Sequence, residues 1–206
     1  MAIPIRGLSQ FKTRLNGGGA RPNLFEVVLP GNIPNDPQGR SDWQGSTDTQ
    51  DKFKFLCKAA ALPASISSPI EVPFRGRTFK VSGDRQFESW TITVINDEDF
   101  AIRKAMEGWM QAMNQYSDHC GLTNPQDYMV NADVYQLGRK QPGAECSPEL
   151  GTGSDGNANL LAQYKMYDIF PTNVSAIDLS YDSENTIEEF TVEFQVNFFA
   201  PVINPN

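Results

Sequence analysis

The residues of this chain that can act as nucleophiles, bases or metal ligands are few and scattered. The one histidine, His119, stands beside Cys120, and the other cysteines are Cys57 and Cys146. Nucleophile and base usually converge from distant segments, so two adjacent residues are poorly placed to activate each other. A structural zinc site needs four ligands in closely spaced pairs, which these positions do not offer. We therefore expect no catalytic site, no metal site and three free thiols, as is typical of a reducing compartment.

Two acidic clusters and one glycine run were the remaining candidates for ligand chemistry. Asp97-Glu98-Asp99 and Asp182 with Glu184 lack the spacing and the closing Glu of a calcium loop. Gly17-Gly18-Gly19 follows no strand pattern and precedes no Gly-Lys-Ser/Thr, so it does not form a phosphate cradle. A carboxylate pair for glycoside cleavage depends on a three-dimensional separation that a sequence leaves open. We predict no cofactor, and an enzyme is the least favoured class.

Composition predicts one folded domain with a substantial core. The chain has 206 residues, 39% of them hydrophobic, with 13 Phe, 6 Tyr and 3 Trp. The net charge is −8, and no Lys or Arg follows Lys165. Such an acidic chain lacks the clustered basic residues that grip nucleic acid. The C-terminal half of the chain, which is the acidic one, is expected to form a solvated face, a surface that docks on the basic N-terminal half of a neighbouring copy, or a surface that repels a polyanion.

The ends and the long connections set the predicted domain organisation. The first fifteen residues lack the apolar run of a signal peptide, and no later window resembles a membrane span, which predicts cytoplasmic assembly without a membrane anchor. Residues 1–22 are an N-terminal arm that is either frayed or packed on its own barrel or a neighbour. Residues 23–206 are expected to form a single β domain with long loops at 30–51 and 138–160.

Strand patterns dominate the rest of the chain. We expect strands near residues 23–29, 53–57, 86–96, 130–134, 161–170, 174–181 and 186–199. Residues 71–81, which carry Arg75, Arg77 and Lys80, are expected to form a projecting hairpin or an edge strand. One amphipathic helix is expected to begin at the capping residues 96–99, with Ile102, Met106, Trp109 and Met113 on its apolar side. A turn at 182–185 joins the last two strands. The fold class is mainly β: an antiparallel β-barrel or sandwich of about seven or eight strands with one amphipathic α-helix.

Five segments, in order, resemble the tail tube protein family of contractile phages (myoviruses). They are Ala20–Val27, Cys57–Pro63, Val81–Arg85 with Trp90–Val94, Asn96–Glu98, and Phe170–Val174. The resemblance implies the tail-tube fold and a structural subunit whose hexameric rings stack into a hollow conduit inside a contractile sheath. Its implied partners are further copies of itself and the sheath, baseplate and tail terminator proteins, with DNA passing through the lumen during infection. Its implied location is the virion tail.

Two surfaces are candidates for this role. The last predicted strand turns its Phe and Val residues to one side and polar residues to the other, which suits a pipe through which a polyanion slides. The candidate lumen-facing residues are Asp178, Asp182, Glu188, Glu189, Glu193 and Gln195. The basic tip of the projecting hairpin is the candidate contact between rings, through Phe74, Arg75 and Arg77.

Two alternatives stay open on sequence alone. The first is the tube protein of a type VI or other contractile injection system, because such tubes share the fold. The second is a carbohydrate-binding β-sandwich, which requires an exposed Trp43 and exposed tyrosines as a sugar platform.

Overall fold

The computed structural model describes residues 7–15, 19–37, 39, 43–44, 46–62, 64–138 and 160–202. Nine strands and four helices lie in these residues. The strands are β1 (Phe25–Val28), β2 (Cys57–Ala60), β3 (Ser65–Phe74), β4 (Arg77–Phe87), β5 (Trp90–Ile95), β6 (Val130–Leu137), β7 (Leu160–Val174), β8 (Glu189–Gln195) and β9 (Phe198–Val202). The helices are α1 (Leu8–Arg14), α2 (Thr47–Leu56), α3 (Ala101–Met113) and α4 (Pro125–Tyr128).

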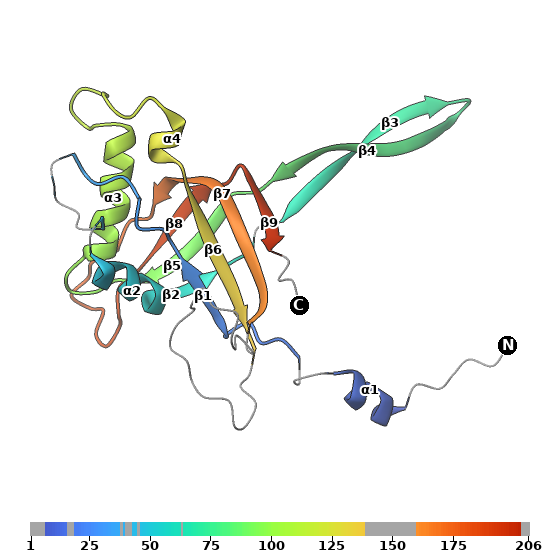
Figure 1. Cartoon of the computed structure of the whole chain (residues 1–206), viewed down its shortest axis with the longest axis horizontal. Helices are drawn as coiled ribbons and strands as arrows, with labels where there is room; N and C mark the ends of the chain where they lie inside the picture. Colours follow the sequence, from blue (N-terminus) through green and yellow to red (C-terminus); the bar gives the residue numbers. More distant parts are fainter. Residues whose placement is uncertain are drawn as a thin grey trace.

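Seven strands form one antiparallel sheet, and the other two form a separate hairpin that projects from it (Figure 1). The sheet order is β1-β6-β7-β8-β5-β2, with β9 also paired to β7. No ladder among the described residues joins β1 to β2, so the sheet ends in open edges. The mainly β, antiparallel fold with an amphipathic helix is confirmed.

Strand β7 holds the two halves of the sheet together. Its first half pairs with β6 and β9, and its second half pairs with β8. A bulge separates the halves: Asn131 on β6 faces both Tyr167 and Asp168 on β7. Asp168 has a φ of 52°, and its N–H donates to the Asn131 side-chain oxygen at 3.1 Å in place of a ladder bond. Such a bulge bends the strand, which lets the sheet turn over on itself.

The two halves enclose one core, with α2 and α3 against its open side (Figure 1). The expected inward residues of β5, Trp90, Ile92 and Val94, are all fully buried. Inward residues of β8, β6 and β7 complete the core: Phe190, Val192, Phe194, Ala132, Val134, Met166 and Ile169. Period-two burial of β5, β6 and β8 is the pattern that their sequences predict, whereas in β7 the bulge leaves the buried Met166 and Ile169 three residues apart.

The helix predicted after residue 99 is α3, but its start differs from the prediction. Ile102, Met106 and Trp109 are buried as expected. The helix begins at Ala101, after Phe100 at a φ of 54°, and no side chain caps it. The Asp97 carboxylate, which was expected to cap the helix, accepts instead a hydrogen bond from the Glu98 N–H at 2.9 Å.

The strand expected over residues 53–57 is wrong. Most of this segment belongs to α2, whose first turn is capped by the Ser46 hydroxyl accepting from the Thr49 N–H at 3.2 Å. Phe53 is buried whereas Phe55 is 85% exposed, because residues two apart point to different faces of a helix. The available signal was Ser46, a residue type favoured at helix N-caps.

The loop expected over 30–51 is wrong in part as well. Ile33 and Trp43 are buried members of the core, and the Trp43 indole N–H donates to the Pro30 carbonyl at 2.8 Å. Helix α2 begins at Thr47, inside the expected loop. The second expected loop, 138–160, falls almost wholly outside the described residues, although Leu160 already belongs to β7.

Near the C-terminus, the predicted strand over 174–181 is wrong. The chain does turn within 182–185, as expected, but the turn joins no pair of strands. Residues 175–188 form an irregular connection between β7 and β8. The long last strand is also divided, because β8 stops at Gln195 and β9 starts at Phe198. Phe198, expected to be buried, is 42% exposed and stacks on Tyr167 with ring centroids 4.5 Å apart.

Candidate assembly surfaces

The β3–β4 hairpin projects from the body and buries almost nothing within the chain (Figure 1). Arg75 and Gly76 form its two-residue turn, with φ values of 45° and 81°. Positive φ at both positions is the geometry of a type I′ turn, whose twist matches that of paired strands. The projecting hairpin is thus as expected from the sequence, but longer than the predicted 71–81.

One face of this hairpin is mostly apolar. The cross-strand pairs Ile70–Val81 and Val72–Phe79 lie on it, with Phe74 opposite Arg77 at the tip, and the pairs Glu71–Lys80 and Pro73–Thr78 lie on the other face. Phe74 and Phe79 are 65% and 64% exposed, and the other apolar residues of this face are also exposed: Ile66, Ile70, Val72 and Val81. A contiguous apolar face that is left in water usually marks a surface for another molecule.

The root of the hairpin is held to the sheet. Phe87 packs edge-on against Phe199 of β9, with ring centroids 5.4 Å apart. Nearer the tip, a bulge brings Gly83 so close to β3 that a Cβ there would lie 2.4 Å from the Ser68 carbonyl oxygen. The direction of the projection is therefore set by an aromatic contact and by a glycine that tolerates close backbone approach.

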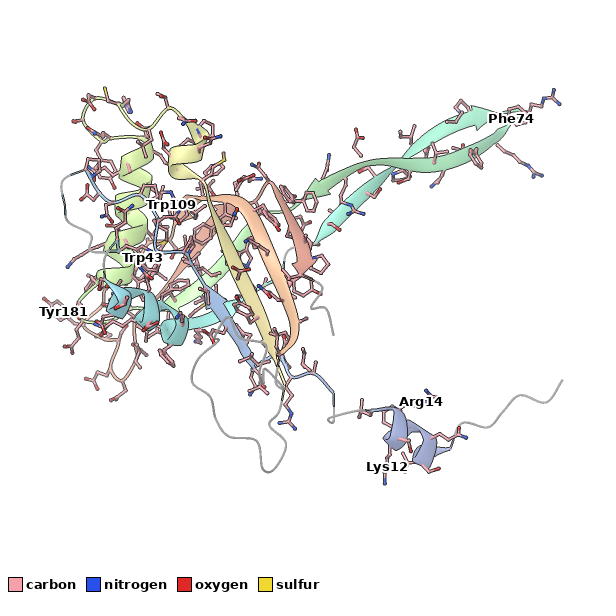
Figure 2. The ribbon with its side chains drawn as sticks, in the orientation of Figure 1. Lys12, Arg14, Trp43, Phe74, Trp109 and Tyr181 are labelled. Carbon is pink, nitrogen blue, oxygen red and sulfur yellow. The ribbon has the colours of Figure 1, made fainter. Side chains whose placement is uncertain are left out.

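The tip of the hairpin is basic. Arg75 and Arg77 form no ion pair with any described residue, and the Arg75 guanidinium lies over the Phe74 ring, 5.4 Å from its centroid. Lys80 is paired with Glu71 at 3.2 Å. Phe74, Arg75 and Arg77, the residues predicted to contact another ring, therefore lie together at the far end of the molecule (Figure 2).

The six predicted lumen-facing residues fall into two places. Glu189, Glu193 and Gln195 lie on β8, opposite its buried Phe and Val residues, as the alternation predicts. Glu189 is paired with Lys58 of β2 at 2.5 Å, and around it the same face carries Thr91, Thr93, Thr191 and Asn173. This strand face is thus polar and close to neutral, with Glu193 as its unpaired carboxylate.

Asp178, Asp182 and Glu188 lie instead in the connection 175–188. Glu188 accepts from the Asn96 side-chain amide at 2.9 Å. Asp178 and Asp182 are exposed and make no side-chain contact with described residues. Between them Leu179 and Tyr181 are also exposed, Tyr181 completely, and the sequence reasoning missed this pairing of acidic and large apolar residues.

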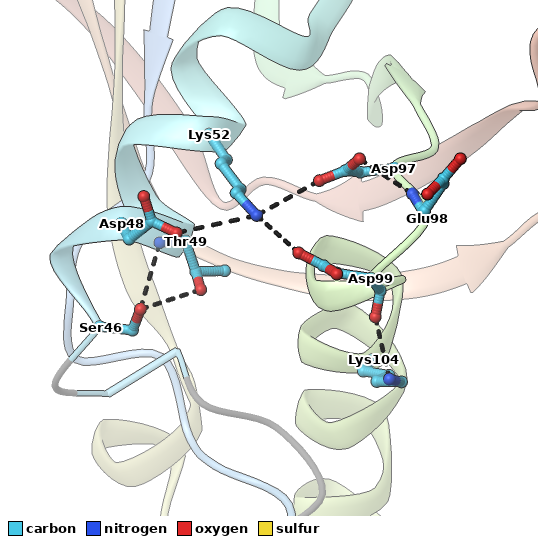
Figure 3. A network of polar contacts seen from close by, with 8 residues as sticks. All are labelled: Ser46, Asp48, Thr49, Lys52, Asp97, Glu98, Asp99 and Lys104. Carbon is cyan, nitrogen blue, oxygen red and sulfur yellow. Dashed lines mark hydrogen bonds and ion pairs between the residues drawn. The ribbon is translucent and has the colours of Figure 1, made fainter.

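The acids at 97–99 have a different task, which is to join α2 to the start of α3 (Figure 3). The Lys52 ammonium lies 2.8 Å from Asp99, 3.3 Å from Asp97 and 3.7 Å from Asp48. The hydrogen bond to Asp99 raises the pKa of Lys52 and lowers the pKa of Asp99. Because the cluster holds its own cation, it is a structural brace between two helices.

The residues screened for catalysis are not brought together. His119 is exposed on a loop, where its ring contacts the Asn114 side chain at 3.2 Å, and Cys57 lies in the core, where burial raises the pKa of its thiol to about 12. Cys146 lies outside the described residues. No group of His, Cys, Asp and Glu suited to a metal occurs in the described part of the chain. None of the described helices is long and apolar enough to cross a membrane.

These features define a class: a β-sheet protein with open sheet edges and a projecting, one-sided hairpin, built to associate with other chains. A sugar platform is not part of it, because Trp43 is only 1% exposed. The comparisons with known proteins agree with this class.

A family model described as phage tail tube protein matches residues 20–200. Tail tube protein gp19 of Enterobacteria phage T4 is 29% identical over 184 residues, covering 89% of this chain and 93% of that protein. The tail tube protein of Serratia phage KSP90 is 24% identical over 190 residues, covering 91% and 93%. The chain belongs to the phage tail tube protein family, and the resemblance seen in the sequence is confirmed.

Solved structures support the fold. A chain from the sheath-tube complex of the PVC extracellular contractile injection system, in its extended state, matches with a TM-score of 0.51 at 13% identity, covering 96% of this chain and 99% of that one. A chain from the sheath/tube terminator of the PVC system gives a TM-score of 0.54 at 13% identity, covering 90% and 97%. At this identity the likeness concerns architecture alone.

Proposed function

We propose that this chain is the repeating structural subunit of a phage tail tube, in which hexameric rings stack into a hollow conduit inside a contractile sheath. Family membership supports the tail tube role. The observation that carries the assembly proposal is the β3–β4 hairpin, whose whole apolar face lies in water in the single chain. The role needs no catalytic group, cofactor or metal.

The open edges of the sheet support ring formation. Strands β1 and β2 end the strand order, and no other described strand pairs with their outer sides. Such edges readily pair with another chain, and a closed ring satisfies all of them. Each copy would then supply both an edge and a hairpin to its neighbours.

The polar face of β8 is the proposed lining of the lumen, through Glu189, Glu193 and Gln195. A neutral to weakly acidic, threonine-rich wall offers no cluster of cations on which DNA phosphates would stick. For Asp178, Asp182 and Glu188 the argument from strand alternation no longer applies, because they lie off the strand.

The proposed partners are further copies of this chain and the sheath, baseplate and tail terminator proteins of the same particle. The solved chains with similar architecture come from a baseplate, a sheath/tube terminator and a sheath-tube complex. The protein would be a component of the virion tail, assembled in the host cytoplasm.

Sedimentation and electron microscopy of the purified full chain test this proposal. We expect rings of six at moderate concentration and stacked tubes with a central channel at higher concentration. A chain that stays monomeric at every concentration would overturn it.

A further inference from the structure

Two opposite ends of the molecule each expose large apolar side chains beside charged ones. Phe74, at the hairpin tip, and Tyr181, in the connection 175–188, lie at the two extremes of the long axis (Figure 2). Both side chains are largely exposed, Phe74 at 65% and Tyr181 at 106%. Each end therefore offers apolar surface that nothing in the chain covers.

The charges at the two ends are opposite. At the hairpin tip the unpaired charges are those of Arg75 and Arg77, since Lys80 is bound to Glu71. The connection holds no basic residue, and the carboxylates of Asp178, Asp182 and Glu184 have no partner among the described residues. Arginine next to an aromatic ring and carboxylates next to Tyr and Leu are complementary in both charge and polarity.

We propose that the hairpin tip of one copy docks on the connection 175–188 of the next copy, with Arg75 and Arg77 on the carboxylates of Asp182 and Glu184. This inference rests on the proposed tube function and adds the acceptor surface to it. Because the two patches differ, the contact is head to tail and repeats from copy to copy.

The charge difference also gives the assembly a direction. Two hairpin tips repel each other, and so do two acidic connections, so tip-to-tip and connection-to-connection contacts are disfavoured. A tube built through this contact is polar, with every hairpin pointing the same way. The contact depends on ionic strength, because exposed charges are screened beyond about 8 Å at physiological salt.

A charge-swap series in the full chain tests the proposal. The tip variant is Arg75→Glu with Arg77→Glu, the connection variant is Asp182→Lys with Glu184→Lys, and the third variant combines all four changes. We expect the concentration needed for tube growth, measured by light scattering and electron microscopy, to rise on the order of tenfold or more in each two-site variant. The combined variant should recover most of that loss, because it restores opposite charges.

Matched controls place the same charge changes elsewhere. Arg85→Glu lies at the hairpin root, and Asp118→Lys with Asp127→Lys lies outside the connection; all should form tubes like the original chain. Circular dichroism should show the same fold in every variant. Normal growth of the tip variant, or no recovery in the combined variant, would overturn the docking proposal while the tube function stands. An original chain that forms no tubes would overturn both.

Crosslinking gives a second readout. In a background with Cys120→Ser and Cys146→Ser, Thr78→Cys and Ser183→Cys, which lie beside the proposed charge pairs and leave them intact, are combined in one chain, and assembled tubes are treated with a flexible bis-maleimide. A ladder of covalent multimers on a denaturing gel is expected, whereas either cysteine alone should give dimers at most. Intact tubes that give no ladder from the double variant would overturn the contact.

Discussion

The hairpin β3–β4 and the strand pair β5–β8 have the same kind of sequence and opposite surroundings. In β5 and β8, Ile92, Val94 and Val192 alternate with polar residues and are fully buried by the rest of the chain. In the hairpin, Val72 and Phe79 alternate just as regularly, yet both stay exposed. Alternation in the sequence thus predicts that one face of a strand is apolar. It does not predict whether the same chain or another molecule covers that face.

The largest expected loss of stability comes from the core side of this comparison. Trp109 is fully buried, and its indole N–H donates to the Tyr128 carbonyl at 2.8 Å. Trp109→Ala should lower the free energy of unfolding by about 3–5 kcal/mol, measured by urea denaturation, because it opens a cavity between α3 and β8. Phe79→Ala is the matched aromatic control on the hairpin. Equal losses of unfolding free energy in Trp109→Ala and Phe79→Ala would contradict the proposed difference between the buried strands and the exposed hairpin.

A smaller, local effect is expected at the hairpin bulge. In Gly83→Ala the new Cβ would meet the Ser68 carbonyl oxygen, so β3 and β4 must shift apart at a cost of about 1–3 kcal/mol. Faster amide exchange should appear in β3 and β4 but not in β5 or β8. Asp84→Ala, at the exposed neighbouring position, is the control and should leave exchange nearly unchanged. Faster exchange across the whole sheet would show that the hairpin and the core are one cooperative unit.

A still smaller effect on stability, with a large effect on assembly, is expected from the apolar face itself. Phe74→Ser with Phe79→Ser should change the free energy of unfolding of the isolated chain by less than about 0.5 kcal/mol, since both rings are already in water. Tube growth should be lost, because the new side chains no longer gain by leaving water. A variant that assembles normally would contradict the role of this face.

The smallest expected effect lies at the brace between α2 and α3, and it depends on pH. Because the Lys52 ammonium lowers the pKa of Asp99, this carboxylate stabilises the fold above its unfolded-state pKa of about 3.9 and loses that contribution as the pH falls through its folded-state pKa. Lys52→Met should therefore lower Tm at neutral pH and differ less from the original chain in acid. Lys54→Met, which removes the pair with Asp51 within α2 and the attraction between Lys54 and Glu26, is the control because it leaves the Asp99 brace in place. A Tm difference that stays constant from pH 7 to pH 2 would contradict this account.

Several elements were predictable because their signals are local. The β-branched run of β5, the apolar stripe of α3 and the turn at Arg75-Gly76 each follow from neighbouring residues. The strand expected at 53–57 failed for a physical reason. Three alternating residues fit a strand or part of a helix, and the Ser46 cap with packing of Phe53 on Trp43 decided for the helix.

For the candidate assembly surfaces, too, the sequence predicted some residue positions correctly and others not. The basic tip with Phe74, Arg75 and Arg77 was predictable, because a turn with strands on both sides places its residues at an end. Asp178 and Glu188 were expected on strands but lie in the connection 175–188, which follows the part of β7 that pairs with β8. Pairing between strands that are far apart in the sequence depends on the partner strand, which the local sequence does not predict.

By itself, the sequence determined the local chemistry of this protein: an acidic chain whose nucleophiles and bases are few and scattered, strands with one apolar face each, and a basic turn. Only the tertiary structure decided which apolar faces are covered within the chain and which are left for another molecule. The physical reason is that alternation and capping are local properties, whereas burial requires a second surface. Residues of β6, β7 and α3 supply that surface to β5 and β8, and no described residue supplies it to the hairpin.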